Sequence, residues 1–135
     1  MATRTGRAPR SADTVLVVEN DDAIRRIYHD ALVAAGYEAI VVGDGISALL
    51  YLESHRAPDA VVVSLPLPRV SGTLVYEDLR SRKTTRPTPV IILSRDQLPP
   101  FPDEYVTVLR KPLETNVLVA AVAAALGKAP SPPVA

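Results

Sequence analysis

The sequence contains no cysteine, so the chain can form neither disulfide bonds nor thiolate metal sites, which fits a reducing, cytoplasmic location. Aromatic residues make up only 4% of the chain against 47% hydrophobic residues, so the core must be built from Val, Leu, Ile and Ala. No run approaches the roughly 20 apolar residues that a membrane helix needs. The arginines near the N-terminus are not followed by an apolar signal segment. Fifteen basic and fifteen acidic residues balance, so no global field favours nucleic acid or an anionic membrane as a partner.

The length and the two ends predict the domain organisation. The 135 residues suit one domain of ordinary size. Residues 1–12 carry three arginines among small polar residues without a hydrophobic period, so we predict a disordered, solubilising arm rather than a nucleic-acid-binding one. Residues 128–135 (KAPSPPVA) are expected to form a disordered, proline-rich tail. The folded domain is then expected over residues 13–127.

Short β-branched segments alternate with helical patterns along this domain. The segments are Thr14–Val18, Glu38–Val42, Asp59–Val63, Pro89–Leu93 and Tyr105–Leu109. Helices are expected over 22–35, about 45–56, about 71–82, and in a last segment closed by Gly127. Asn20 or Asp21 can cap the first helix, and Gly36 can end it. This alternation predicts an α/β fold with a doubly wound parallel sheet.

Polar residues follow the predicted strands at the place where open α/β sheets bind ligands. Right-handed crossovers put the carboxyl ends of all the strands on one edge of the sheet. The residues just after the strands are Glu19 and Asn20, Gly43 and Asp44, Ser64, Ser94, and Lys111. We therefore expect any functional site to lie among these residues.

The order of these residues resembles that of the receiver domain of two-component response regulators. Further motifs that support the resemblance are Gly36-Tyr37, Asp44-Gly45, Pro58-Asp59, the PxxxG pattern of Pro68 to Gly72, and Lys111-Pro112. The resemblance covers roughly residues 14–127 and implies a flavodoxin-like sheet of five strands in the order 2-1-3-4-5.

The resemblance also implies a chemistry. In the family, two acidic residues after strand one and an aspartate at the end of strand three bind Mg²⁺, and that aspartate accepts a phosphoryl group from a histidine kinase. A Ser or Thr after strand four and a Lys after strand five contact the phosphoryl group, and Ser94 and Lys111 match these two positions.

The resemblance breaks at the residues that would carry this chemistry. Ser64 stands where the phosphorylated aspartate is expected, and Asn20 offers a neutral oxygen where the family has a carboxylate. Only Glu19 remains to balance Lys111, so Mg²⁺ binding is expected to be lost and no cofactor is expected. We interpret the set as a degenerate phosphorylation site without catalytic residues: Glu19, Asn20, Ser64, Ser94 and Lys111.

Ser64 is not expected to replace the aspartate as a phosphoryl acceptor. A serine hydroxyl needs a neighbouring base, and the two histidines, His29 and His55, fall on predicted helices away from this edge. A serine phosphate ester would also hydrolyse too slowly for a signal that must be reset quickly. We therefore expect no enzymatic activity.

Three further departures follow the fourth strand. The family usually has a small residue after the strand-four hydroxyl, whereas this chain has Arg95, which either lies across the pocket mouth near Glu19 or Asp21 or points to solvent. Residues 96–104 (DQLPPFPDE) contain three prolines, so the fourth helix is expected to be reduced or missing. Val108 stands where the family often has a switching aromatic residue.

The altered face suggests an interaction surface that contains Leu98, Phe101 and Val108. In the family, the fourth helix, fifth strand and fifth helix form the usual docking and dimerisation face. Alternatively, Leu98 and Phe101 fold back and cover the part of the core that the missing helix leaves open.

We therefore expect an atypical, stand-alone response regulator, a pseudo-receiver that works as a phosphorylation-independent interaction module in bacterial signalling. No DNA-binding output domain is expected, and the expected partner is a signalling protein or a second copy in a homodimer, not nucleic acid or a membrane. One alternative is a receiver that is still phosphorylated in a phosphorelay. The other is a small flavodoxin-like domain that binds a metabolite, although the sequence contains no glycine-rich phosphate loop.

Overall fold

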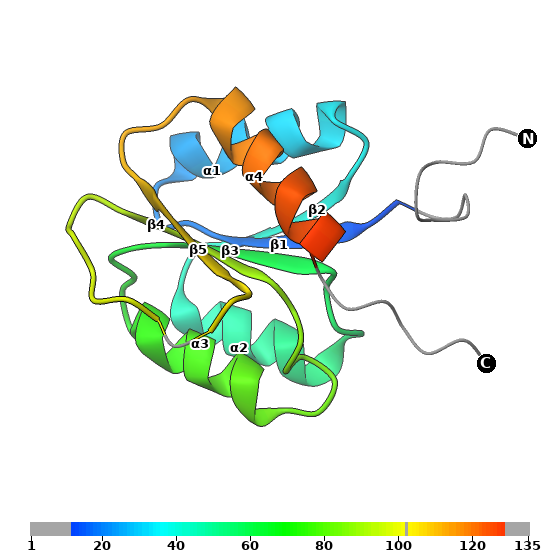
Figure 1. Cartoon of the computed structure of the whole chain (residues 1–135), viewed down its shortest axis with the longest axis vertical. Helices are drawn as coiled ribbons and strands as arrows, with labels where there is room; N and C mark the ends of the chain where they lie inside the picture. The colour runs from blue at the N-terminus through cyan, green and yellow to red at the C-terminus, as the bar shows by residue number, and fades with distance from the viewer. Residues whose placement is uncertain (1–11, 102, 129–135) are drawn as a thin grey trace, which may run out of the picture.

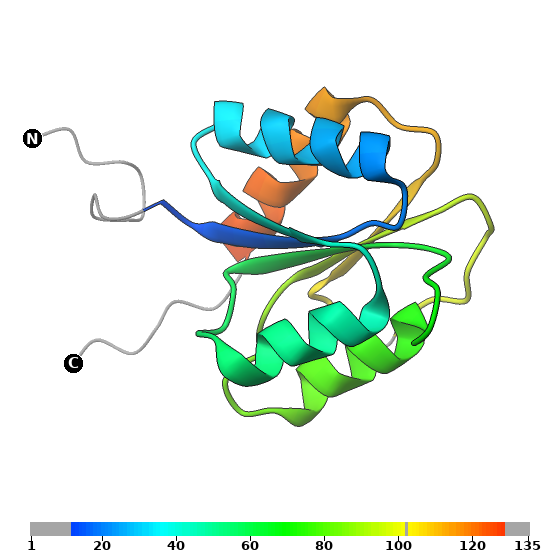
Figure 2. The ribbon, with the colours of Figure 1, turned by 180° about the vertical axis from the view of Figure 1, so that it is seen from behind.

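The computed structural model describes residues 12–101 and 103–128, which form a five-stranded parallel sheet with helices on both faces (Figures 1 and 2). The strands are β1 (Thr14–Val18), β2 (Glu38–Val42), β3 (Ala60–Ser64), β4 (Val90–Ser94) and β5 (Val106–Arg110). The helices are α1 (Asp22–Ala34), α2 (Gly45–Ser54), α3 (Gly72–Ser81) and α4 (Thr115–Lys128). The strand order β2-β1-β3-β4-β5 confirms the predicted sheet.

The core has two halves, one on each face of the sheet. Helices α1 and α4 cover one face, and α2 and α3 cover the other (Figure 1). Because the central strands are covered on both faces, β3 and β4 are buried at every position and their sequences are almost continuously apolar. All the buried hydrophobic residues except Tyr28 are Val, Leu, Ile or Ala, as the composition predicted.

The helix ends follow the predicted capping pattern at α1 but not at α4. The carboxylate of Asp21, rather than the side chain of Asn20, caps α1 and accepts a hydrogen bond from Ile24 N at 2.9 Å. Gly36 has the left-handed φ of 98° expected after a helix. Gly127 does not close α4, which runs on through Lys128, so the prediction was wrong there. A glycine can continue the last turn of a helix at modest cost as well as end it.

Three strands are shifted by one residue from the prediction. The backbone pairing of β3 extends to Ser64, opposite Leu93, and that of β4 extends to Ser94, opposite Arg110. A polar side chain does not end a strand, because the hydrogen bonds of the ladder use only backbone groups. Ser64 and Ser94 are therefore the last residues of their strands.

The connection between β4 and β5 contains no helix within its described residues, 95–101 and 103–105. Prolines in this segment lack backbone donors and fix φ, so they disfavour a helix. Leu98 and Phe101 are half-buried and pack against the core on the side of α2 and α3. The predicted terminal arm and tail lie outside the described residues except for Ala12 and Lys128, and Lys128 belongs to α4. Among the helices described, none combines the length and the apolar character needed to cross a membrane.

Candidate functional site

Three polar side chains are buried at the carboxyl edge of the sheet. Glu19 directly follows β1 and is 5% exposed, whereas Ser64 and Ser94 end β3 and β4 and are 1% and 2% exposed. Val18 pairs with Val63, so Glu19 and Ser64 occupy neighbouring positions at the ends of adjacent strands. The topology thus brings these residues to one edge, as the strand order required.

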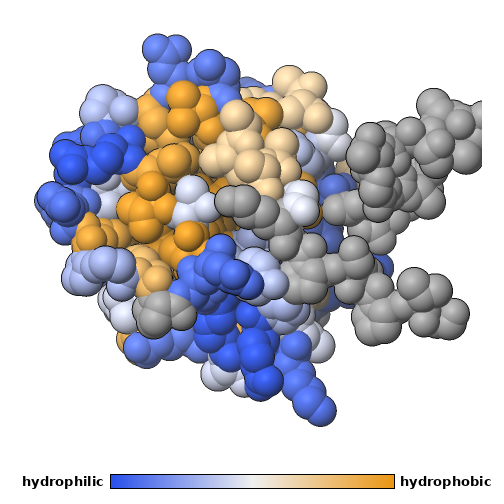
Figure 3. Space-filling view, in the orientation of Figure 1, coloured by the Kyte–Doolittle hydropathy of each residue, from blue (hydrophilic) through white to orange (hydrophobic). Residues whose placement is uncertain are grey.

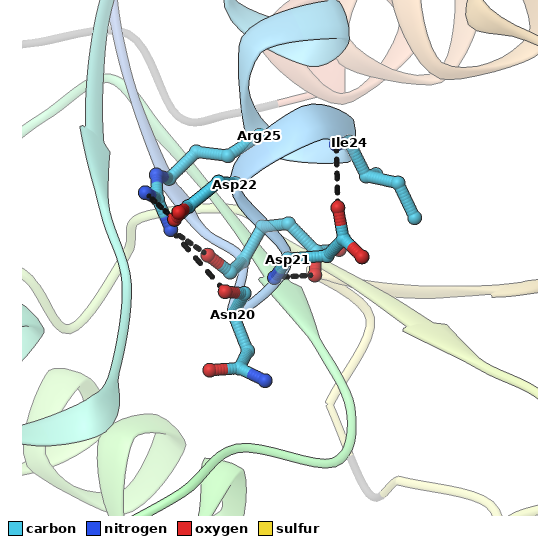
Figure 4. Close-up of polar contacts among 6 residues, drawn as sticks. Asn20, Asp21, Asp22, Ile24 and Arg25 are labelled. Atoms are coloured by element: carbon cyan, nitrogen blue, oxygen red, sulfur yellow. Dashed lines mark hydrogen bonds and ion pairs between the residues drawn. The ribbon is translucent and has the colours of Figure 1, made fainter.

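The turn between β1 and α1 is held by backbone and side-chain hydrogen bonds (Figure 4). Glu19 Oε2 accepts a hydrogen bond from Asp21 N at 2.8 Å. Arg25 Nη1 donates to Glu19 O at 2.9 Å, and the same guanidinium forms an ion pair with Asp22. The exposed side chain of Asn20 points away from Arg25 (Figure 4). Of the two residues in the acidic-pair positions, only Glu19 turns its side chain into the protein.

Two buried oxygen atoms at this edge have no hydrogen-bond partner: Glu19 Oε1 and Ser64 Oγ. Ser94 differs, because its Oγ accepts a hydrogen bond from Asp96 N at 3.0 Å and donates to Asp96 O at 3.1 Å. Buried hydroxyl groups are usually hydrogen-bonded, so the unpartnered Ser64 Oγ marks a local defect.

Lys111 reaches across the edge from the end of β5. Its Nζ donates to Leu65 O at 2.7 Å, and its backbone N donates to Ser94 O at 2.9 Å. Burial lowers the pKa of the Lys111 ammonium, the Glu19 carboxylate partly opposes this shift, and the charge of Arg95 adds to it. Glu19, Ser64 and Lys111 are called the edge cluster below.

The remaining predicted edge residues have structural contacts or face solvent. Asp44 caps α2 and accepts a hydrogen bond from Ser47 N at 2.7 Å, which is the main cause that lowers the pKa of Asp44. Its carboxylate also lies 3.9 Å from Arg69 Nη1. Arg95 is exposed and forms no ion pair with any described residue, so its side chain does not close the edge through a contact with Glu19 or Asp21.

A second polar cluster, which the sequence analysis missed, fastens the β4–β5 connection to α3. Asp103 accepts hydrogen bonds from Tyr76 Oη and from Tyr105 N, both at 2.9 Å, and forms an ion pair with Arg80. The side chains of Arg80 and Asp103 are only 17% and 12% exposed. Tyr76, Arg80 and Asp103 are called the loop cluster below.

Aromatic contacts and burial complete the loop cluster. The Arg80 guanidinium lies 5.2 Å from the centre of the Tyr76 ring, and the Tyr76 ring meets the Phe101 ring edge-on at 5.2 Å. Burial would raise the pKa of the Asp103 carboxyl, but the hydrogen bonds from Arg80, Tyr105 N and Tyr76 outweigh it and hold that pKa below its usual range. The only signal in the sequence was the i, i+4 spacing of Tyr76 and Arg80 on a helix.

The predicted interaction residues divide between two environments. Leu98 and Phe101 lie half-buried on the core, which agrees with the alternative that they cover it. Val108 on β5 is 40% exposed. His29 lies within α1 and His55 caps the end of α2, both away from the edge cluster.

Two surface hollows also lie away from the edge cluster. One of about 330 Å³ lies between α2 and α3 and is lined by Leu50 and Arg82 among others. The other, of about 520 Å³, lies at the opposite edge of the sheet near Thr14 and Asp59. Neither gives the metabolite-binding alternative the pocket at the carboxyl edge on which it depended.

The chemistry of the edge cluster does not suit Mg²⁺. This small, hard cation prefers several anionic or neutral oxygen ligands in octahedral geometry. The edge cluster offers one carboxylate, of Glu19, next to the ammonium group of Lys111, and the nearby Asn20 amide is exposed. Among the described residues, no group of three or more His, Cys, Asp or Glu side chains could hold a metal ion.

Comparisons with known proteins place this chain among signalling domains. The profile of the response regulator receiver domain matches residues 15–123. The sensory transduction protein RegX3 of Mycolicibacterium smegmatis is 38% identical over 121 residues, which cover 84% of this chain and 50% of RegX3. The polar-differentiation response regulator DivK of Brucella anthropi is 33% identical over 81 residues, which cover 60% of this chain and 65% of DivK. The chain thus spans about half the length of RegX3 and just under two thirds of DivK.

The fold has a clear counterpart among solved structures. The receiver domain of the sensor histidine kinase PA1611 from Pseudomonas aeruginosa PAO1 gives a TM-score of 0.75 at 24% identity, covering 87% of this chain and 99% of that one. That structure has a magnesium ion coordinated in its active site cleft. At this identity the likeness concerns the fold alone.

Proposed function

Since the chain belongs to the response regulator receiver domain family, we propose that it is an atypical receiver in two-component signalling that acts without phosphorylation at the end of β3. The observation that carries the proposal is Ser64, a serine in the last position of β3, where the family has its phosphoryl acceptor. A carboxylate there would form a labile acyl phosphate, whereas a serine hydroxyl needs a base to react. Ser64 is 1% exposed, and its Oγ has no hydrogen-bond partner to act as that base.

The charge of the edge cluster supports the same proposal. Glu19 and Lys111 balance each other, so the edge lacks the excess of negative charge that attracts a divalent cation. We propose that the chain binds no Mg²⁺ there, in contrast to the PA1611 receiver domain. Without the cation, the negative charge of a transferred phosphoryl group would meet only one neighbouring ammonium group.

The β4–β5 connection supports a loss of switching. We propose that the fourth helix of the family is missing here and that the proline-rich segment takes its place. The loop cluster fastens this segment to α3 through Asp103, and Val108 offers no aromatic ring that could change its rotamer. The face is therefore held in one arrangement, which suits an interaction module that presents a fixed shape. Its partner would be a protein, and no enzymatic activity or binding to nucleic acid or membrane is proposed.

Treatment with a phosphodonor tests the proposal directly. We expect the intact mass to stay unchanged after incubation with acetyl phosphate and Mg²⁺. Beryllofluoride with Mg²⁺ should leave the NMR spectrum unchanged as well. The PA1611 receiver domain, treated in parallel, provides the positive control.

Two other results would each favour an alternative. A Mg²⁺-dependent shift confined to Glu19, Asn20 and Ser64 would mean that the edge still takes part in a phosphorelay. A metabolite that raises the melting temperature, together with a failure to capture any protein partner, would favour a metabolite-binding domain.

A further inference from the structure

Helices α2 and α3 lie side by side on one face of the sheet, with a groove of about 330 Å³ between them (Figure 2). Residues of α2, of α3 and of the C-cap of α3 line this groove: Ile46, Leu49, Leu50, Glu53, Asp78 and Arg82. Figure 3 shows a wide apolar surface over α4, but α4 covers the other face of the sheet. The groove between α2 and α3 is therefore a separate site.

Helix α2 has apolar side chains on two of its sides. Its inner side packs on the sheet through Ala48 and Leu52. Its groove residues, at positions 46, 49, 50 and 53, follow the i, i+3, i+4, i+7 spacing of a second helix face, and three of the four are apolar. Leu50 is 59% exposed, more than any other large hydrophobic residue that the structure describes. A helix with apolar residues on all sides is normally buried, so the second face of α2 indicates a partner.

The opposite wall of the groove is held in place from behind. Asp78 and Arg82 form this wall and pair at 2.8 Å. Asp78 lies two residues from Tyr76 and two from Arg80, and two helical residues turn the chain by about 200°. The loop cluster therefore grips the side of α3 that faces away from the groove. A groove that is fixed in this way binds a partner at little cost in ordering.

We propose that the groove binds an amphipathic helix of a partner protein, which inserts apolar side chains one turn apart and places a lysine or arginine next to Glu53. The inference rests on the function proposed above and deepens it, because it names the surface and the kind of partner that the interaction module uses.

The walls of the groove favour a helix over other occupants. Backbone groups inside a helix are already hydrogen-bonded within it, so a groove between two helices offers an extended peptide no free backbone partners. A helix satisfies its own backbone and needs to present only a row of apolar side chains. A second copy of this chain fits less well. A two-fold axis would place the groove against the same groove, and two hollows do not fill each other.

The charges that line the groove call for a basic residue in the partner. Two carboxylates and one guanidinium line it, those of Glu53, Asp78 and Arg82, so the lining has one more negative than positive charge. Asp78 and Arg82 pair with each other, whereas Glu53 is exposed and forms no ion pair with a described residue. A basic side chain of the partner would complement the Glu53 carboxylate at the end of the apolar stripe.

Selection from a library of helical peptides tests the proposal with a defined probe. The peptides are displayed on phage, have about 20 residues so that they form helices in isolation, and vary along one face. The full chain is the target. We expect the selected peptides to carry two apolar residues at i and i+4 and a lysine or arginine one turn further. Changes in the NMR spectrum on binding should centre on Leu49, Leu50 and Glu53.

Substitutions in the groove test the binding mode of a selected peptide. Leu50→Lys should weaken its binding more than about tenfold, because a charge replaces an apolar contact. Ile27→Lys is the matched control and should leave binding unchanged, since Ile27 is 51% exposed on α1, on the other face of the sheet. Glu53→Lys should weaken binding about threefold, and a peptide with glutamate in place of its basic residue should regain it. Fluorescence anisotropy measures the affinities, and thermal unfolding checks that each variant is folded.

The proposal is contradicted if the library yields no binder, if the NMR changes lie outside the groove, or if Leu50→Lys binds the peptides as well as the unmodified chain does. It is also contradicted if Leu50→Lys converts a dimer into a monomer in sedimentation equilibrium, because a second copy would then occupy the groove. These results would leave the proposed function standing as long as acetyl phosphate does not label the protein. Labelling would overturn the proposed function even if the peptides bound in the groove.

Discussion

The edge cluster and the loop cluster are two polar sites of similar size that differ in how completely their buried polar atoms are hydrogen-bonded. In the edge cluster, Glu19 Oε1 and Ser64 Oγ are buried without partners. In the loop cluster, both carboxylate oxygens of Asp103 accept hydrogen bonds, and only Arg80 Nη2 lacks a partner. An unpaired buried polar group costs stability, whereas a buried pair that is broken costs even more. The difference indicates that the loop cluster stabilises the folded chain, whereas the edge cluster lowers its stability.

The largest effect is expected from breaking the loop cluster. Asp103→Ala leaves the partly buried Arg80 charge without its carboxylate partner and with only Thr88 O as a hydrogen-bond acceptor, so the free energy of unfolding should fall by about 3 kcal/mol. Asp78→Ala is the matched control, because it removes the ion pair between Asp78 on α3 and Arg82 at the C-cap of that helix. The side chains of Arg82 and Asp78 are 33% and 24% exposed. The loss from Asp78→Ala should stay below about 1 kcal/mol. Urea denaturation measures both, and equal losses would contradict the importance assigned to Asp103.

The same cluster predicts a dependence on pH. The folded state holds the pKa of Asp103 below its unfolded value, so the ionised carboxylate stabilises the fold. This contribution is fully present above the unfolded pKa of about 3.9 and is lost as the pH falls through the lower folded pKa. The stability difference between the unmodified protein and Asp103→Asn should therefore narrow below about pH 4. A difference that stays constant to the lowest pH at which both fold would show that the charge of Asp103 does not matter.

A smaller effect is expected where the two strand-end serines are compared. Ser64→Ala removes an unpartnered buried hydroxyl and should raise the free energy of unfolding by about 1 kcal/mol. Ser94→Ala removes a hydroxyl that forms two hydrogen bonds with the Asp96 backbone and should lower it by about 1 kcal/mol. Thermal and urea unfolding of the two variants measure this contrast. Destabilisation by Ser64→Ala would mean that its Oγ has a partner after all.

No effect on labelling is expected when only the phosphoryl acceptor, a carboxylate at the end of β3, is restored. Ser64→Asp should not become labelled by acetyl phosphate, because Asn20 and Arg95 still leave the edge short of negative charge. Intact mass spectrometry with Mg²⁺ present gives the answer, and the PA1611 receiver domain again serves as the positive control. Labelling of this variant would show that the acceptor alone had been limiting.

The sequence predicted the fold better than it predicted the contacts at the site. The alternation of apolar segments with helical patterns was enough to predict a parallel sheet, because burial on both faces dictates continuous apolar strands. The strand order was predicted from the resemblance to receiver domains and not from this pattern. The loop cluster could not be predicted, since Arg80 and Asp103 lie 23 residues apart and meet only when the chain has folded. The sequence left two positions open for the Arg95 side chain. No residue pattern distinguished a side chain that points to solvent from one that contacts the edge of the sheet.

Arg25 gives the β1–α1 corner a positive charge that belongs to the chain itself. Its guanidinium donates to Glu19 O at 2.9 Å and lies against Asp22. A tethered side chain has a fixed local concentration, whereas the occupancy of a site by a dissolved ion depends on the concentration of that ion. The β1–α1 corner should therefore keep its shape whether divalent ions are abundant or removed by a chelator.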